Sequence, residues 1–387
     1  MTTLGVEPRP LLVITEEMYS YSFGDDHPWV ADRAKVAVDV ASHFGLLGQF
    51  DVSYPHPLDD ATLRLVHSQD YIDATRSGAP NPKYGIGTDD NPLNPQLPEA
   101  ASRIAAGTLD AVKAVFEGVA PRAVNLSGGL HHAFASSMSG FCLYNDAAIA
   151  IQWLLDHGLE RVAYVDFDAH HGDGVESIFW NDPRVLTISI HESGLYLFPN
   201  TGFAKDIGGP NAAGTAVNVA LPKDASDDEW LQTIHAIIPP LLKKFRPQFV
   251  ISQHGADPHR DDPLADLQIS INAMARAYHS MREWAESFAD GKWVAVGGGG
   301  YRMDSVARAW TQVLAAVADV ELNLSAKMPD YWESKFGSGV SRTLGDAGVS
   351  ALIDNFDPHR IVTHCPHPAL VQTSGYVFPY WGLRPYG

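Results

Sequence analysis

The sequence predicts one α/β domain in which a mainly parallel β-sheet carries helices on both faces. Short apolar segments rich in β-branched residues recur along the chain, and longer segments with helical periodicity lie between most of them. The short segments are apolar throughout, which is typical of strands buried on both faces of a parallel sheet. With 45% hydrophobic and 19% charged residues, the 387-residue chain can bury a large core.

Seven segments fit the strand pattern. In chain order they are LLVIT (11–15), AVNLS (123–127), VAYVDF (162–167), VLTISI (185–190), VNVAL (217–221), FVISQ (249–253) and WVAVG (293–297). Six segments have helical periodicity, near residues 31–46, 100–117, 146–157, 227–245, 270–289 and 303–317. No linker, repeat or low-complexity stretch interrupts this alternation, so we expect a single domain over residues 1–387.

Two further segments fit neither pattern. Residues 77–98 are too rich in Gly, Pro and Asn for a regular element, so we expect a long loop, and loops of this length are usually functional or disordered. Residues 325–387 have weak periodicity and many aromatic residues and prolines. We treat them as a C-terminal extension, to which the sequence assigns no role.

The composition excludes several classes of protein. The formal net charge of −19, from 27 Lys+Arg against 46 Asp+Glu, argues against a nucleic-acid-binding protein, which would present a basic stripe to phosphates. Cys142 and Cys365 cannot form a disulfide framework, so we expect a reducing, cytoplasmic environment. The N-terminus has no signal-peptide pattern, and no stretch approaches about 18 uninterrupted apolar residues. We expect a soluble protein that does not bind membranes; its oligomeric state stays open.

Acidic and imidazole side chains gather directly after four of the predicted strands. Since the carboxyl ends of parallel strands meet at the edge where open α/β sheets place their ligands, we expect one common site. The residues are His131 and His132 after the strand at 123–127; Asp166, Asp168, His170, His171 and Asp173 in DFDAHHGDG; His254, Asp257 and His259 after the strand at 249–253; and Tyr301 after the glycine run at 297–300.

The DFDAHHGDG segment points to a metal. Asp166, Asp168 and His170 share parity, so continued strand alternation would direct all three to one side. Burying two carboxylates this close costs on the order of several kcal/mol unless a cation neutralises them. Mixed nitrogen and oxygen ligands suit a divalent ion such as Zn²⁺, and an open catalytic site needs three protein ligands. Asp257, from another strand end, is the candidate third ligand.

Single residues in these segments also have structural interpretations. His171, His254 and His259, each taken alone, are more often satisfied hydrogen-bonding groups than functional ones. The adjacent pair His131 and His132 fits a structural role and general acid–base catalysis equally well.

Two other stretches resemble functional motifs only superficially. The run Gly297–Gly300 is not a nucleotide-binding loop, because Arg302 stands where GxGxxG needs glycine. The PHRIVTHCPHP stretch lacks a partner cysteine for a metal site, and we interpret it as an ordinary loop. Its metal-binding residue types are His359, His364, Cys365 and His367.

At these motifs the sequence resembles the histone deacetylase superfamily, on the fold shared with arginase. The resemblance covers about residues 11–320, where SGGLHHA, SGFCLYND, YVDFDAHHGDGVE, HESGLYLFPNTG, GAD and GGGGY occur in the order typical of the superfamily. YGIGTDDNP and SQHGADPHRDDPLADL are most similar to the bacterial acetoin-utilisation-type deacetylases. This implies a zinc-dependent amidohydrolase, with Fe²⁺ as an alternative metal, that removes acetyl groups from lysine side chains of a protein or peptide substrate.

The resemblance also implies residue roles at the metal and the base. Asp168, His170 and Asp257 match the catalytic metal ligands. Asp166 would orient His131, and Asp173 would orient His132. His132 would act as general base and acid, His131 would support it, and Tyr301 would donate a hydrogen bond to the developing oxyanion. A structural K⁺ site would take oxygens from Asp166, Asp168, His170, Ser189 and Ile190.

Further positions match substrate contacts. Phe141 and Phe198 match the aromatic walls of the acyl-lysine channel, and Gly299 lies with the substrate-binding positions. Asp89 matches the rim aspartate that holds the substrate backbone. Thr88 stands where the superfamily usually has tyrosine, so the peptide preference stays open.

Three alternative functions remain at the level of sequence. The first is an acetylpolyamine or other small-amide hydrolase of the same fold. An arginase-like dimanganese enzyme is disfavoured, because GADPHRDD offers one well-placed aspartate, Asp257, where such enzymes offer two. A non-catalytic acyl-lysine binding module is also disfavoured, because no catalytic part is missing.

Overall fold

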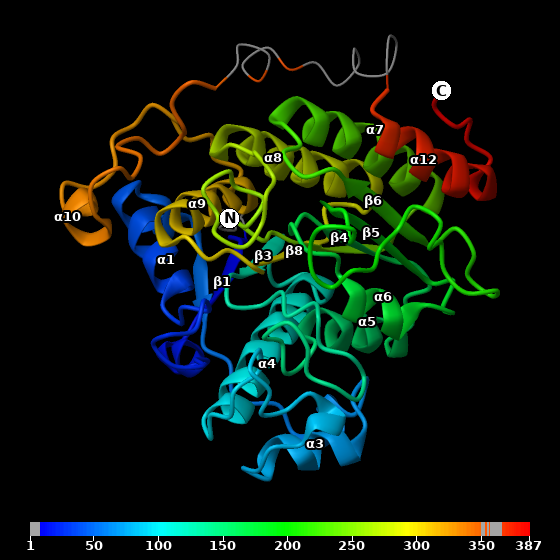
Figure 1. Ribbon diagram of the computed structural model, residues 1–387, viewed down its shortest axis with the longest axis horizontal. Coiled ribbons are helices and arrows are strands. Elements are labelled where there is room, and N and C mark those ends of the chain that lie inside the picture. The colour runs from blue at the N-terminus through cyan, green and yellow to red at the C-terminus, as the bar shows by residue number, and fades with distance from the viewer. Residues whose placement is uncertain (1–7, 350–352, 354–355, 357–365) are drawn as a thin grey trace, which may run out of the picture.

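One parallel β-sheet forms the centre of the molecule. The computed structural model describes residues 8–349, 353, 356 and 366–387, and eight strands of this part pair in the order β2-β1-β3-β8-β7-β4-β5-β6, all parallel (Figure 1). The strands are β1 (Leu11–Val13), β2 (Asp51–Ser53), β3 (Arg122–Asn125), β4 (Val162–Asp166), β5 (Val185–Glu192), β6 (Ala216–Leu221), β7 (Phe249–Gln253) and β8 (Trp293–Val296). The predicted fold class and all seven predicted strands are confirmed. The additional strand, β2, is a polar three-residue edge strand without an apolar run.

Helices cover both faces of this sheet (Figure 1). One core cluster packs α1, α7, α8 and α9 against one face, and a second packs α3, α4, α5 and α6 against the other. The α-helices described are α1 (Arg33–His43), α2 (Asp60–Leu63), α3 (Gln69–Arg76), α4 (Leu97–Phe116), α5 (Asp146–Asp156), α6 (Asp173–Phe179), α7 (Asp227–Phe245), α8 (Ile271–Phe288), α9 (Met303–Ala318), α10 (Trp332–Phe336) and α12 (Pro368–Val377). The six predicted helices are confirmed within a few residues.

The strand order explains how distant segments meet. β3, β8, β7 and β4 are consecutive neighbours in the sheet, although β8 follows β3 by more than 160 residues in the chain. Each of these four strands ends immediately before one of the polar groups identified in the sequence. The sheet therefore brings His131, Tyr301, Asp257 and Asp168 to one edge.

The loop predicted at 77–98 ends where α4 begins at Leu97, and it contains a short 3₁₀ helix, Pro82–Tyr84. Within it, the Asn91 side-chain oxygen accepts a hydrogen bond of 3.0 Å from the Phe141 backbone N–H. The loop thus supports a residue assigned to the substrate channel.

The C-terminal extension packs onto the sheet domain in two places. Trp332 of α10 lies in a small cluster with Val36 and Val40 of α1, and Leu370 of α12 joins the core beside β6 and α7. In the described part of the chain, none of the helices has the length and apolar character needed to cross a membrane. Cys142 is a buried free thiol, and Cys365 lies outside the described residues.

Candidate active site

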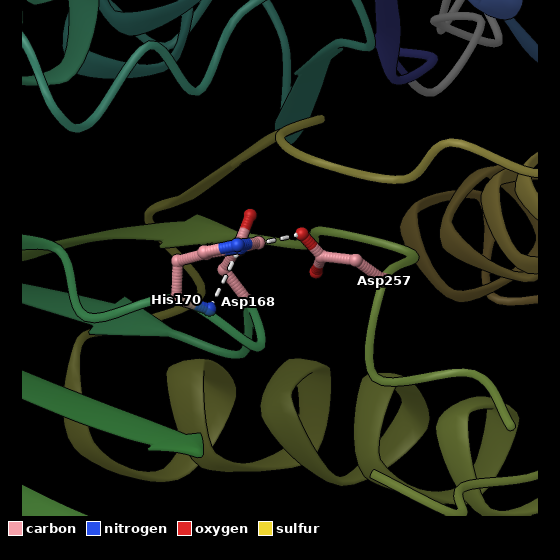
Figure 2. Close-up of side chains that lie close together, drawn as sticks. All are labelled: Asp168, His170 and Asp257. Carbon is pink, nitrogen blue, oxygen red and sulfur yellow. Dashed lines mark hydrogen bonds and ion pairs between the residues drawn. The ribbon is translucent and has the colours of Figure 1, made fainter. Parts of the chain in front are cut away.

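Asp168, His170 and Asp257 form a buried cluster at the carboxyl ends of β4 and β7. Figure 2 shows the three side chains turned toward one another. His170 Nδ1 lies 3.1 Å from Asp168 Oδ1 and 2.9 Å from Asp257 Oδ2. One potential ligand atom from each residue lies within 4.8 Å of the other two. Asp168 and His170 lie on the same side, as expected, although the strand itself ends at Asp166.

Two buried negative charges lie close together in this cluster, which favours binding of a cation. Both carboxylates are fully buried, and within the described chain neither pairs with a lysine or arginine. Burial and the neighbouring Asp168 carboxylate raise the pKa of Asp257 to about 7. Two buried carboxylates and one imidazole nitrogen directed at a common point are a donor set that suits a divalent ion such as Zn²⁺.

Strand parity alone predicted that Asp166 would point into this cluster, but it does not. The strand ends at Asp166, whose Oδ2 accepts hydrogen bonds from His131 Nδ1 (2.8 Å) and from the Tyr164 hydroxyl (2.9 Å). Its Oδ1 accepts the Asp168 backbone N–H at 3.1 Å. The alternation breaks because the chain leaves the extended conformation here, and Asp166 instead fixes the orientation of His131.

A second dyad lies beside the first. His132 Nδ1 is 2.7 Å from Asp173 Oδ1, and the two imidazoles approach each other at 3.0 Å between their Nε2 atoms. Burial lowers the pKa of His131, but the Asp166 and Asp168 carboxylates outweigh it and raise the pKa to about 9. Burial and the adjacent His131 charge lower the pKa of His132 to about 4. Near neutral pH His131 is therefore charged, and His132 is neutral and able to accept a proton.

A cavity of about 210 Å³ leads to these groups. Phe141 and Phe198 contribute its aromatic walls, and His132, His170 and Tyr301 line it with them. The Phe198 ring contacts His132 at 5.0 Å between centroids, and the Phe141 ring contacts Tyr301 at 6.0 Å. A narrow apolar passage ending at two imidazoles and a phenol suits an uncharged alkyl chain with a polar end.

Two substrate positions differ from the sequence-based expectation. Asp90 lines the cavity, and Asp89 does not. Gly299 is also absent from the cavity lining: its backbone N–H donates to Asp168 Oδ2 at 2.8 Å, and a Cβ there would lie 2.1 Å from Asp257 Oδ2. Gly299 therefore positions the carboxylates, and any side chain at this position would displace them.

The glycine run before Tyr301 adopts backbone conformations that other residues avoid, with φ of 150° at Gly298 and 124° at Gly300. The buried guanidinium of Arg33 donates to the carbonyl oxygens of both glycines, at 3.1 and 2.8 Å, and stacks on the Trp29 ring. Arg33 holds the segment that presents Tyr301. No sequence pattern indicates this role for Arg33, because one arginine in an amphipathic helix looks like a surface residue.

Burial, reinforced by the Asp257 and Asp168 carboxylates, raises the pKa of Tyr301 well above its usual value. The phenol is thus protonated and can donate a hydrogen bond.

Three of the five residues matched to a K⁺ site lie on neighbouring strands, and the other two, Asp168 and His170, follow the end of β4. Asp166 of β4 and Ser189 of β5 are register partners, and Ile190 is buried next to Ser189. The Ser189 hydroxyl is 2.8 Å from His191 Nδ1. The potassium ion itself stays a prediction.

The other histidines singled out in the sequence, where they lie in the described residues, have structural partners. His171 contacts Thr201 and Glu176, His254 contacts backbone carbonyls, and His259 contacts Asp346 at 3.0 Å. His367 caps α12 by accepting the Ala369 backbone N–H. His359, His364 and Cys365 lie outside the described residues.

Comparisons with known proteins agree with this geometry. The histone deacetylase domain family matches residues 27–317. The acetoin utilization protein AcuC of Bacillus subtilis is 38% identical over 334 residues, covering 84% of this chain and 86% of that protein, and AcuC of Staphylococcus xylosus is 32% identical over 340 residues, covering 86% and 88%.

Solved structures are similar over a comparable length. An HDAC homolog from Aquifex aeolicus has a TM-score of 0.78 at 27% identity, covering 91% of this chain and 99% of that one. An HDAC homolog complexed with SAHA has a TM-score of 0.77 at 27% identity, covering 92% and 99%. The chain belongs to the histone deacetylase family and is a hydrolase of the deacetylase type.

Proposed function

We propose that this hydrolase cleaves the amide of Nε-acetyl-lysine in proteins or peptides, giving lysine and acetate, with Zn²⁺ as the metal and Fe²⁺ as the alternative. The observation that carries the proposal is the aromatic-walled cavity ending at His132, His170 and Tyr301. Its walls match an uncharged four-carbon stem, and its end matches an amide. A free lysine product carries a charge that the walls do not stabilise, so the passage favours product release.

The residues at the end of the cavity have different roles in the reaction. Asp168, His170 and Asp257 would hold a divalent ion, which would supply Lewis acidity toward the substrate carbonyl and toward a water molecule. His132, neutral and oriented by Asp173, takes the proton from the attacking water and later delivers one to the leaving amine. His131 stays charged beside it, and the Tyr301 hydroxyl stabilises the developing oxyanion.

Two rival functions differ from the proposed one, the first in its metal requirement and the second in its substrate. A dimanganese enzyme needs a second set of metal ligands. In the described residues, one group of three side chains, Asp168, His170 and Asp257, brings its possible ligand atoms within 4.8 Å of one another. An acetylpolyamine hydrolase would use the same kind of cavity. The two functions are distinguished by which substrate is cleaved faster.

The test uses purified protein stripped of metal and reloaded separately with Zn²⁺, Fe²⁺ or Mn²⁺. Bound metal is quantified, and acetate release is measured with an acetyl-lysine peptide, an acetylpolyamine and a simple acetamide. We expect one metal ion per chain and the highest kcat/KM on the peptide. Equal or faster turnover of the acetylpolyamine would reject the protein substrate, and two manganese ions per chain would reject the mechanism.

A further inference from the structure

A second concavity, of about 570 Å³, lies next to the catalytic cavity at the same edge of the sheet. We call it the flank groove. It lies beyond the ends of β5 and β6, and the C-terminal extension provides one wall through α12. The residues that define it are Leu195, Tyr196, Phe203, Lys205, Pro368 and Tyr376.

We propose that the flank groove binds the polypeptide that flanks the acetyl-lysine, so that the enzyme selects a protein segment by sequence and not by the acetyl group alone. This inference rests on the proposed function. It also gives the C-terminal extension a role in substrate selection.

Continuity with the catalytic cavity supports this occupant. Leu197 and Phe198 line the cavity, and Leu195 and Tyr196 line the groove, on a single loop. Leu195 and Phe198 are three Cα steps apart, which is at most about 11 Å. An extended peptide whose acetyl-lysine enters the cavity therefore reaches the groove within about four residues, at roughly 3.3 Å per residue.

The groove exposes large side chains that a soluble surface normally avoids in one place. Leu195 is 71% exposed, Tyr196 58% and Tyr376 51%. Contiguous exposed apolar surface of this kind marks interaction sites, and tyrosine is enriched in binding surfaces because its ring gives apolar area with little entropy to lose.

Both walls are held in place before any peptide binds. On the loop, the Ser193 N–H donates to the Leu221 carbonyl of β6 at 2.7 Å, and the Tyr196 N–H donates to the Ser193 carbonyl at 2.9 Å. On α12, the Thr373 hydroxyl donates to the Asn218 carbonyl of β6 at 2.6 Å. Preorganised walls reduce the entropy lost on binding.

The charge of the groove indicates which residue types it prefers in the polypeptide beside the acetyl-lysine. Its lining contains Lys205 and, among the described residues, no aspartate or glutamate, although the chain carries a net charge of −19. Lys205 makes no ion pair within the described chain, so it is free to meet a carboxylate. The preferred flank therefore carries an aromatic or aliphatic side chain and an acidic residue.

The experiment compares two substrates. One is a blocked acetyl-lysine amide that fills only the cavity. The other is an extended peptide with acetyl-lysine at its centre, and with a phenylalanine and an aspartate about four residues away on either side. The variants are Tyr196→Ala, Tyr376→Ala and the double variant. The control is Tyr54→Ala, at a 69% exposed tyrosine after β2, which forms the opposite edge of the sheet from β6.

We expect kcat/KM on the extended peptide to fall about tenfold in each single variant, mainly through KM, since losing a central tyrosine contact commonly costs at least this much. Turnover of the blocked amide should not change, and Tyr54→Ala should match the wild type on both substrates. Lys205→Glu should reverse the preference between peptides with aspartate and with lysine in the flank.

Each contrary result has a distinct meaning. Equal losses on both substrates, or no loss on either, would overturn the flank groove while leaving deacetylation intact. Failure of the wild type to cleave either substrate would reject the proposed function, and the inference with it. If light scattering finds a dimer that Tyr196→Ala converts to a monomer, the groove holds a second copy of the chain and the proposal is wrong.

Discussion

Asp257 and His259 stand two residues apart after β7, yet they belong to two buried clusters with opposite electrostatics. Asp257 faces Asp168 and His170, and its pKa rises to about 7 through burial and the Asp168 carboxylate. His259 meets Asp346, which also accepts hydrogen bonds from Arg308 at 2.5 Å and from the Ile271 N–H at 2.7 Å. Burial alone would raise the pKa of Asp346, but His259 and Arg308 outweigh it and hold the pKa well below its usual value.

Residue type therefore does not separate a structural cluster from a functional one. Both clusters combine aspartate and histidine side chains that are at least nine-tenths buried. The Asp346 cluster supplies its own cation, Arg308, and is electrostatically complete. The basic groups beside the two carboxylates of the Asp257 cluster are the imidazoles of His131 and His170. Neither carboxylate has an arginine or lysine partner in the described chain, so the cluster lacks a permanent positive charge and suits an added cation.

Substitution in the Asp257 cluster should reduce activity most strongly. Asp257→Asn should remove bound metal and lower kcat/KM by about 10³-fold or more, since the Lewis acid contributes several kcal/mol. The fold should survive, because the change removes one of two like charges. Metal analysis, circular dichroism and acetate release check this. The control is Asp261→Asn, at a half-exposed neighbour, and a metal-free but fully active Asp257→Asn would contradict the comparison.

Tyr301→Phe tests the contribution of the Tyr301 hydroxyl to turnover separately from metal binding. We expect normal metal content and a loss of about 10²–10³ in kcat, which is typical when one oxyanion donor is removed. Single-turnover kinetics beside metal analysis measure both quantities. Unchanged kcat would remove the hydroxyl from the mechanism.

Asp346→Asn tests the complete cluster. Removing one partner of a buried ion pair should lower the free energy of unfolding by about 3 kcal/mol, while the folded fraction keeps its metal and its kcat. Urea unfolding and active-site titration measure the two effects. Asp330→Asn, at an exposed position of the same extension, should have no effect.

The pH dependence of this stability has a definite sign. Because the folded-state pKa of Asp346 is lowered, its contribution is fully present above about pH 4 and is lost as the pH falls below that value. The stability difference between the wild type and Asp346→Asn should therefore shrink in acid. A difference that grows in acid would contradict the assignment.

The smallest effect is on thermal stability. Zn²⁺ at a hundredfold excess over its dissociation constant should stabilise the wild type by about 2.7 kcal/mol, because only the folded chain presents the three ligands together. Calorimetry with and without chelator measures the shift. Asp346→Asn should show the same increment, and Asp257→Asn should show none.

Much of the fold and of the catalytic cluster was predictable from the sequence. Apolar runs identify buried strands without tertiary information, and the residues after those strands share an edge by topology. Among the helices that the sequence did not predict, α6 begins within the polar DFDAHHGDG motif, and α12 lacks a continuous apolar stripe. Neither offers a periodic signal.

The remaining residues depend on contacts between segments far apart in the chain. Asp346 lies 87 residues from His259, and Arg33 lies 265 residues from Gly298, so no local pattern connects either pair. The choice between Asp89 and Asp90 depends on how one loop turns at the mouth of the cavity. The resemblance placed Gly299 with the substrate-binding positions. Its close approach to Asp257 is visible only in three dimensions.

The position of β8 between β3 and β7 has a consequence for biosynthesis. A growing polypeptide that stops before Trp293 holds two part-sheets, each ending in an unpaired central strand. Unpaired strands of this kind recruit other chains, so the interval before β8 emerges from the ribosome is the one most exposed to aggregation and most in need of chaperones.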